Sequence, residues 1–151
     1  MNSLIATYPD EAANAQTCEV IVVPCMDFRF RKPVQEAVEQ ALGISWCDLR
    51  SEPGVSLTFI KPSTRLDALL ADIELAIKAH QVSKVILVDH SDCGAYRMAG
   101  LQFADMGIEE GKHEENLHTS KRVIHEKFPN IEVITLYAKK HNGKIELIKM
   151  H

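Results

Sequence analysis

Short apolar runs separated by longer amphipathic stretches set the pattern of this chain. The clearest runs, Val-Ile-Val-Val at 20–23 and Val-Ile-Leu-Val at 85–88, are rich in β-branched residues and bounded by polar ones. Such runs are typical of buried strands in a parallel sheet. The pattern as a whole predicts four such strands, at residues 19–24, 44–49, 84–89 and 131–138.

Apolar residues between these runs recur at helical spacing. The longest predicted helix covers residues 64–80, where Thr64 and Asp67 form a capping-box pattern. Residues 31–42 are predicted as a helix with Pro33 in its first turn. Residues 107–111 are predicted as a polar turn, and residues 113–128 as a polar, mostly exposed helix. The last strand, residues 144–149, follows Asn142-Gly143, a strong signal for a tight hairpin.

Strands and helices alternate until this final hairpin, which predicts the fold class. We expect an α/β, Rossmann-like three-layer fold with a mostly parallel central sheet and an antiparallel C-terminal edge strand. At 151 residues the chain is long enough for one domain and too short for two ordinary ones. We therefore expect a single domain over 1–151, with residues 1–17 as an N-terminal arm.

Charge and composition exclude several classes of partner. Seventeen basic residues against twenty-one acidic ones give a net charge of −4, without the basic face that nucleic-acid or membrane-surface binding needs. No stretch is long and apolar enough to span a bilayer. The first residues lack the features of a signal peptide, so we expect no nucleic acid, no membrane and a cytoplasmic location.

Residues that can bind a metal follow two of the predicted strands. Cys25 comes directly after the first strand, and His90 and Cys93 follow the third. Ligands bind at the carboxyl ends of strands in open α/β sheets, so we expect these side chains to converge. Two thiolates and an imidazole suit Zn²⁺ with its fourth position open to water, whose pKa such a site lowers to about 7.

Asp27 and Arg29 stand two and four residues after Cys25. Alternation along an extended segment would aim all three side chains to the same side. A bidentate pair with Arg29 would keep Asp27 ionised. Two roles are then open for Asp27: it accepts a hydrogen bond from the zinc-bound water, or it becomes the fourth ligand and closes the site.

Cys25-x-Asp27-x-Arg29 after the first strand, with His90-x-x-Cys93-Gly after the third, resembles the β-class carbonic anhydrases. The resemblance implies a zinc enzyme in which a metal-bound hydroxide hydrates CO₂ reversibly to bicarbonate. It further implies Cys25, His90 and Cys93 as zinc ligands, with Asp27 and Arg29 as a catalytic dyad. The smallest unit would be a homodimer, or a higher even oligomer, with the N-terminal arm reaching across to the partner.

Two departures from this family bear on the substrate. Phe28 replaces the usual Ser or Ala before Arg29, and the loop at residues 50–54 is one residue longer and adds the carboxylate of Glu52. Both changes are expected near the pocket. Two alternatives therefore stay open: a hydrolase of carbonyl sulfide or carbon disulfide, and a non-catalytic zinc-binding homologue with Asp27 on the metal.

The remaining candidate side chains receive structural interpretations. Cys18 and Cys47 are predicted to be packing residues, and Trp46 to belong to the core or a dimer interface. His80 would interact with the dipole at the last turn of its helix. The predicted helix at 113–128 contains no histidine pair four residues apart, so no second metal site is expected.

Overall fold

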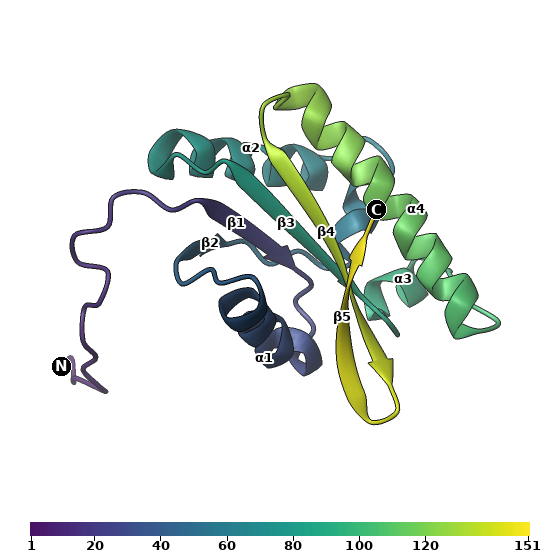
Figure 1. The fold of residues 1–151 in the computed structure, drawn as a ribbon, viewed down its shortest axis with the longest axis horizontal. Helices are drawn as coiled ribbons and strands as arrows, with labels where there is room; N and C mark the ends of the chain where they lie inside the picture. Colours follow the sequence, from purple (N-terminus) through teal and green to yellow (C-terminus); the bar gives the residue numbers. More distant parts are fainter.

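A five-stranded sheet forms the centre of the computed structural model, which describes residues 1–151. The strands lie in the order β2-β1-β3-β4-β5 (Figure 1). Their bounds are β1 Val20–Pro24, β2 Cys47–Leu49, β3 Lys84–His90, β4 Glu132–His141 and β5 Lys144–Met150. The first four strands pair in parallel and β5 pairs with β4 antiparallel. The predicted fold class is confirmed.

Four α-helices surround the sheet (Figure 1). They are α1 Phe28–Glu36, α2 Thr64–His80, α3 Gly94–Met98 and α4 Met106–Lys127, with a π-helical turn at Ala37–Ala41 and a 3₁₀ helix at Val55–Phe59. None of these helices combines the length and the apolar character needed to cross a membrane.

Both faces of the sheet are buried, each against different helices. Ile21 and Val85 pack in one core cluster with apolar residues of α2 and α4, whereas Val20 and Ile86 pack in another with residues of α1. Adjacent residues of a strand point to opposite faces, which is why these runs are apolar without alternation.

The carboxyl ends of β1 and β3 form the switch point of this topology. The two strands are neighbours in the sheet, with Pro24 opposite Val88. The chain leaves β1 toward α1 on one face and leaves β3 toward α3 and α4, of which α4 covers the other face. Crevices at such points are where ligands bind in open α/β sheets.

Helix α1 begins at Phe28, three residues before the predicted start. Asp27 is the reason, because its Oδ1 accepts a hydrogen bond from the backbone N–H of Arg29 at 3.0 Å and caps the helix. Pro33 therefore lies inside the helix rather than in its first turn. The bounds of α2 match the prediction, but Ser63 caps it, accepting from Leu66 N–H at 3.1 Å.

The prediction for α4 is wrong at its start and about its exposure. Asp105 caps the helix, so the expected turn at 107–111 is helical. One side of the helix is buried, although most of its residues are polar: His113, Asn116, Leu117, Ser120 and Ile124. Polar side chains that hydrogen-bond one another in the interior explain the difference.

The N-terminal arm, the C-terminal hairpin and the edge strand β2 differ in how they relate to the sheet. Residues before β1 form an arm that runs away from the sheet and holds neither helix nor strand (Figure 1). The hairpin between β4 and β5 turns at Asn142 and Gly143, which both have positive φ, as the Asn-Gly signal predicted. Strand β2 is shorter than predicted, and Trp46 precedes it with about half of its surface exposed.

Candidate metal centre

Cys25, His90 and Cys93 converge beside the switch point. Cys25 follows β1, His90 ends β3, and Cys93 is the residue before α3. The ligand atoms of the three side chains all lie within 4.8 Å of one another. The geometry therefore brings together the three residues that the sequence singled out for a metal.

The tautomer of His90 fits a metal ligand. Its Nδ1–H donates to the carbonyl of Ser91 at 2.8 Å, and its Nε2 is buried without any hydrogen-bond partner. A buried polar atom is normally satisfied, so an unpaired nitrogen beside two thiols points to a missing ligand. Two sulfurs and this nitrogen are the donors that zinc prefers.

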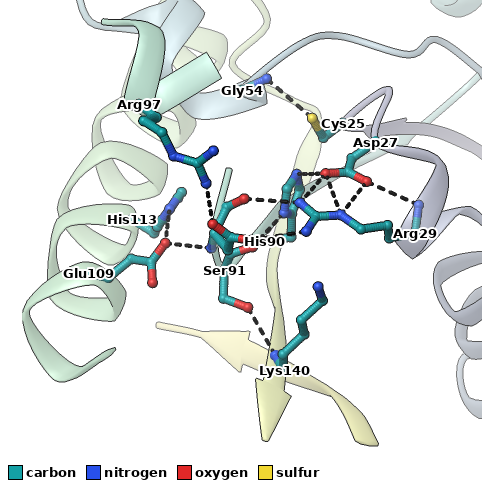
Figure 2. Close-up of polar contacts among 11 residues, drawn as sticks. Cys25, Asp27, Arg29, Gly54, His90, Ser91, Arg97, Glu109, His113 and Lys140 are labelled. Carbon is teal, nitrogen blue, oxygen red and sulfur yellow. Dashed lines mark hydrogen bonds and ion pairs between the residues drawn. The ribbon is translucent and has the colours of Figure 1, made fainter. Parts of the chain in front are cut away.

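Contacts on both sides hold His90 in place. Ser91 N–H donates to the carbonyl of Ala138 at 3.0 Å, and Lys140 N–H donates to Ser91 Oγ at 2.9 Å (Figure 2). The ring of Phe30 stacks on the imidazole with a centroid distance of 4.2 Å. Sequence reasoning missed Phe30, although its spacing of four residues from Val34 places both on the buried face of α1.

Gly54 contacts the first thiol through its backbone. Its N–H donates to Cys25 Sγ at 3.4 Å (Figure 2). The residue adopts a left-handed conformation with φ +67°, and a Cβ at this position would lie 2.9 Å from Cβ of Ala95. Only glycine fits here, so this close approach explains the Pro-Gly sequence of the loop.

The two thiols differ in their acidity. The adjacent Cys93 thiol, together with His90 and the Gly54 N–H, holds the pKa of Cys25 well below its usual value despite burial. The adjacent Cys25 thiol and burial raise the pKa of Cys93. The contact between the two sulfurs thus favours ionisation of Cys25 over ionisation of Cys93.

Arg29 forms a bidentate ion pair with the carboxylate of Asp27. Its Nε lies 2.9 Å from Oδ1 and its Nη2 lies 2.6 Å from Oδ2 (Figure 2). These hydrogen bonds lower the pKa of Asp27 to about 2. The predicted alternation along an extended segment is wrong, because Arg29 lies in the first turn of α1; the pair forms across that turn instead.

Asp27 stands next to the cluster without joining it. Its Oδ2 lies 3.8 Å from His90 Nε2, whereas the cluster of mutually close ligand atoms comprises Cys25, His90 and Cys93 alone. Both oxygens of the carboxylate are engaged by Arg29. In this arrangement Asp27 lies outside the group of three candidate ligands.

Arg29 also connects the two loops that carry the thiols. Its Nη1 donates to Asp92 Oδ2 at 2.9 Å, and its Nη2 donates to the carbonyl of Asp92 at 3.1 Å. Asp92 in turn pairs with Arg97 and donates its N–H to Glu109 Oε1 at 2.6 Å. Asp92, with φ of 55°, therefore fixes the tight turn between His90 and Cys93 through hydrogen bonds.

A buried polar network lies beneath this loop. The Asp89 carboxylate accepts from His113 Nδ1–H at 2.6 Å, from Ser56 N–H at 3.0 Å and from the Ser56 hydroxyl. The Ser56 hydroxyl is also 2.7 Å from the Tyr96 hydroxyl, to which Asn116 donates at 2.8 Å. All five residues are buried. No local pattern indicates this network beyond the spacing of His113, Asn116 and Ser120 on one helix face.

An apolar cavity of about 430 Å³ adjoins the metal cluster. Cys25 and His90 line it together with Phe30, Val34 and Leu49. Phe28 does not, because its side chain is 86% exposed. The side chain of Phe28 therefore lies outside the wall of this cavity in the single chain.

The added carboxylate of the 50–54 loop is also absent from this cavity. Glu52 is buried, and its oxygens lie 2.5 Å from Arg50 Nη1 and 3.0 Å from Arg65 Nη1. Thr58 donates a further hydrogen bond at 2.9 Å. Glu52 therefore anchors the loop that presents Gly54 to Cys25.

One family model, two sequence relatives and one solved structure are similar to this chain. A family model described as "Putative carbonic anhydrase" matches residues 15–149. An uncharacterized protein of Rickettsia bellii is 31% identical over 120 residues, which is 76% of this chain and 73% of that protein. An uncharacterized protein of Rickettsia conorii is 30% identical over 120 residues, covering 76% of this chain and 64% of that protein. A tetrameric β-carbonic anhydrase of Sordaria macrospora has the same fold, with TM-score 0.55 and 18% identity over 88% of this chain and 81% of that one.

Proposed function

The chain belongs to the carbonic anhydrase family, as its paired motifs predicted, and from this premise we propose that it catalyses the zinc-dependent, reversible hydration of CO₂ to bicarbonate. The observation that carries the proposal is the cluster of Cys25, His90 and Cys93 beside an apolar cavity. The net reaction consumes one CO₂ and one water, and releases one bicarbonate and one proton to the solvent.

Cys25, His90 and Cys93 would hold the zinc ion. A bound Zn²⁺ with three protein ligands acts as a Lewis acid that activates water near neutral pH. The hydrogen bond from His90 Nδ1–H to Ser91 keeps the metal-facing nitrogen unprotonated. The N–H of Gly54 supports negative charge on the Cys25 sulfur.

Asp27 would orient the attacking water. Its carboxylate is ionised, because Arg29 holds its pKa at about 2, so it can accept a hydrogen bond but not donate one. Arg29 also keeps both oxygens in place. This arrangement supports an open, working site over the alternative in which Asp27 occupies the metal permanently.

The cavity suits a small, linear, uncharged substrate. Phe30, Val34 and Leu49 give it apolar walls, which admit CO₂ and exclude excess water from the reacting centre. Carbonyl sulfide has a similar shape, so the same walls would accept it. The exposed position of Phe28 removes one reason for preferring the sulfur substrates.

We further propose that the working unit is a homodimer or a higher even oligomer. The Sordaria macrospora protein with the same fold is described as tetrameric. In this chain the arm carries exposed apolar side chains, among them Leu4, Ile5 and Tyr8, which are typical of an interface.

The test is stopped-flow CO₂ hydration by zinc-loaded protein between about pH 6.5 and 9, beside Asp27→Asn. We expect activity that rises with pH through about 7 and that falls at least tenfold in the variant. Arg97→Met is the matched control, since it removes the positive charge that pairs with Asp92 and leaves the contacts of Asp27 in place. Stoichiometric zinc without hydration at any pH would overturn the proposal, and hydrolysis of carbonyl sulfide would then be assayed.

A further inference from the structure

A second group of metal-capable side chains lies at the opposite end of β1. Cys18 precedes the strand, Asp48 lies in β2, and His80 is the last residue of α2. One ligand atom from each side chain lies within 4.8 Å of the others. Cys25, in contrast, follows the carboxyl end of β1, so this group is separate from the candidate catalytic centre.

We propose that Cys18, Asp48 and His80 form a second metal site, which takes a divalent ion of the zinc class. A thiolate, a carboxylate and an imidazole are all zinc ligands, and a softer set than calcium or magnesium would select. Three protein ligands leave a fourth position for water.

The backbone fixes the three side chains relative to one another. Cys18 N–H donates to the carbonyl of His80 at 3.1 Å. Asp48 pairs with Ile21 in the parallel ladder of β1 and β2, which places it on the same face of the sheet as α2. Because each ligand comes from a different hydrogen-bonded element, a metal would meet a preformed group of donors rather than order a loop.

The charges around the group favour a cation. His80 Nδ1 lies 2.8 Å from Asp48 Oδ2, so carboxylate and imidazole are already in contact. The group sits at the C-terminal end of α2, where the helix dipole is negative.

A simpler interpretation is an ion pair of His80 with Asp48 beside a packing cysteine. The chain contains a comparison for it: His141 lies 3.4 Å from Glu146 in the terminal hairpin, without a thiol. Cys47 is the matching thiol control, because it neighbours Asp48 in β2 but belongs to the wall of the cavity instead. Substitutions of His141 and Cys47 therefore show whether a loss of metal binding is specific to Cys18, Asp48 and His80 or follows the loss of any histidine or cysteine.

The experiment counts metal equivalents in metal-free, reduced protein. Co²⁺ is titrated while thiolate-to-metal charge-transfer absorption is followed, and bound Zn²⁺ is measured after equilibrium dialysis. We expect two equivalents per chain in the native protein and one in both Cys18→Ser and His80→Ala. Cys47→Ser and His141→Ala should retain two. The same number of equivalents in the native protein and in Cys18→Ser would overturn the proposal.

The background Cys93→Ser isolates the second site from the first. In this variant we expect one equivalent of Co²⁺ with charge-transfer absorption, and a Tm that rises with zinc concentration. Both effects should vanish in Cys93→Ser with Cys18→Ser. Their persistence in the double variant would contradict the proposal. Because none of these readouts is CO₂ hydration, the second site stands or falls independently of the proposed activity.

Discussion

Arg29 is the residue at which the two loops of the candidate centre meet. One guanidinium binds the Asp27 carboxylate and both the side chain and the carbonyl of Asp92. The first contact sets the charge of Asp27, and the second fixes the turn between His90 and Cys93. Arg is suited to this task because its planar donors can serve two acceptors at once.

Replacing Arg29 by Met should return the acidity of Asp27 toward normal. We expect the pKa of Asp27 to rise from about 2 toward about 3.9, measured by carboxyl carbon NMR titration. A folded-state pKa below the unfolded value stabilises the native protein above about pH 4 and loses this contribution as pH falls toward 2. Arg97→Met is the control and should leave Asp27 unchanged. An Asp27 pKa that stays near 2 without Arg29 would contradict this account.

Gly54 and Gly43 offer a matched pair for testing the close approach to Cys25. Both have φ near +68°, but a Cβ at Gly43 meets nothing, whereas one at Gly54 meets Ala95. Gly43→Ala should cost about 1 kcal/mol of unfolding free energy from backbone strain alone. Gly54→Ala should cost about 2–4 kcal/mol and weaken zinc binding, as measured by denaturant unfolding and competition with a chelator. Equal effects in the two variants would refute the steric argument.

At the scale of elements, buried polar contacts of α4 stabilise the loop from His90 to Cys93, which carries two of the candidate metal ligands. His113 bonds to Asp89, the residue directly before the candidate ligand His90. Its Nε2 has no partner, and Glu109 Oε1 lies 4.0 Å away. Removing the imidazole would leave the buried Asp89 carboxylate with its contacts to Ser56 and a longer hydrogen bond, 3.4 Å, from the Tyr96 hydroxyl.

His113→Phe should therefore destabilise the protein by about 3 kcal/mol. The ring volume is nearly kept, so the loss reports the hydrogen bond to Asp89 rather than a cavity. His118→Phe, on the exposed side of the same helix, should change the unfolding free energy by no more than about 0.5 kcal/mol. Chemical denaturation of both variants measures the difference, and equal values would show that the network contributes nothing special.

The bounds of the helices and strands show which of them local sequence patterns can predict. Strands β1 and β3 and helix α2 were predicted within one residue, because unbroken apolar runs and a long apolar stripe are local signals. The starts of α1 and α4 were not, since they depend on which of several polar residues serves as the cap: Asp27 and Asp105. The buried face of α4 escaped detection because its polar residues satisfy one another only in three dimensions.

At the scale of the whole molecule, sheet order determines the site. The motifs after β1 and β3 are 65 positions apart between Cys25 and His90, yet adjacent strands place them side by side. Strand alternation and the general rule for ligand sites in α/β sheets sufficed to predict this convergence. The stacking of Phe30 on His90 and the hydrogen bond from Gly54 to Cys25 depend on exact loop paths, which no local pattern encodes.

The N-terminal arm carries large apolar side chains that nothing in the single chain buries. Leu4, Ile5 and Tyr8 each expose more than four-fifths of their surface, and burying a large apolar side chain contributes about 1.5–3 kcal/mol. If the arm packs on a partner, replacing all three by Ser should weaken self-association by well over tenfold. Sedimentation equilibrium measures this, with Met98→Ser, also strongly exposed but outside the arm, as the control. Unchanged masses for the triple variant would place the oligomer interface elsewhere and leave the arm without a role in assembly.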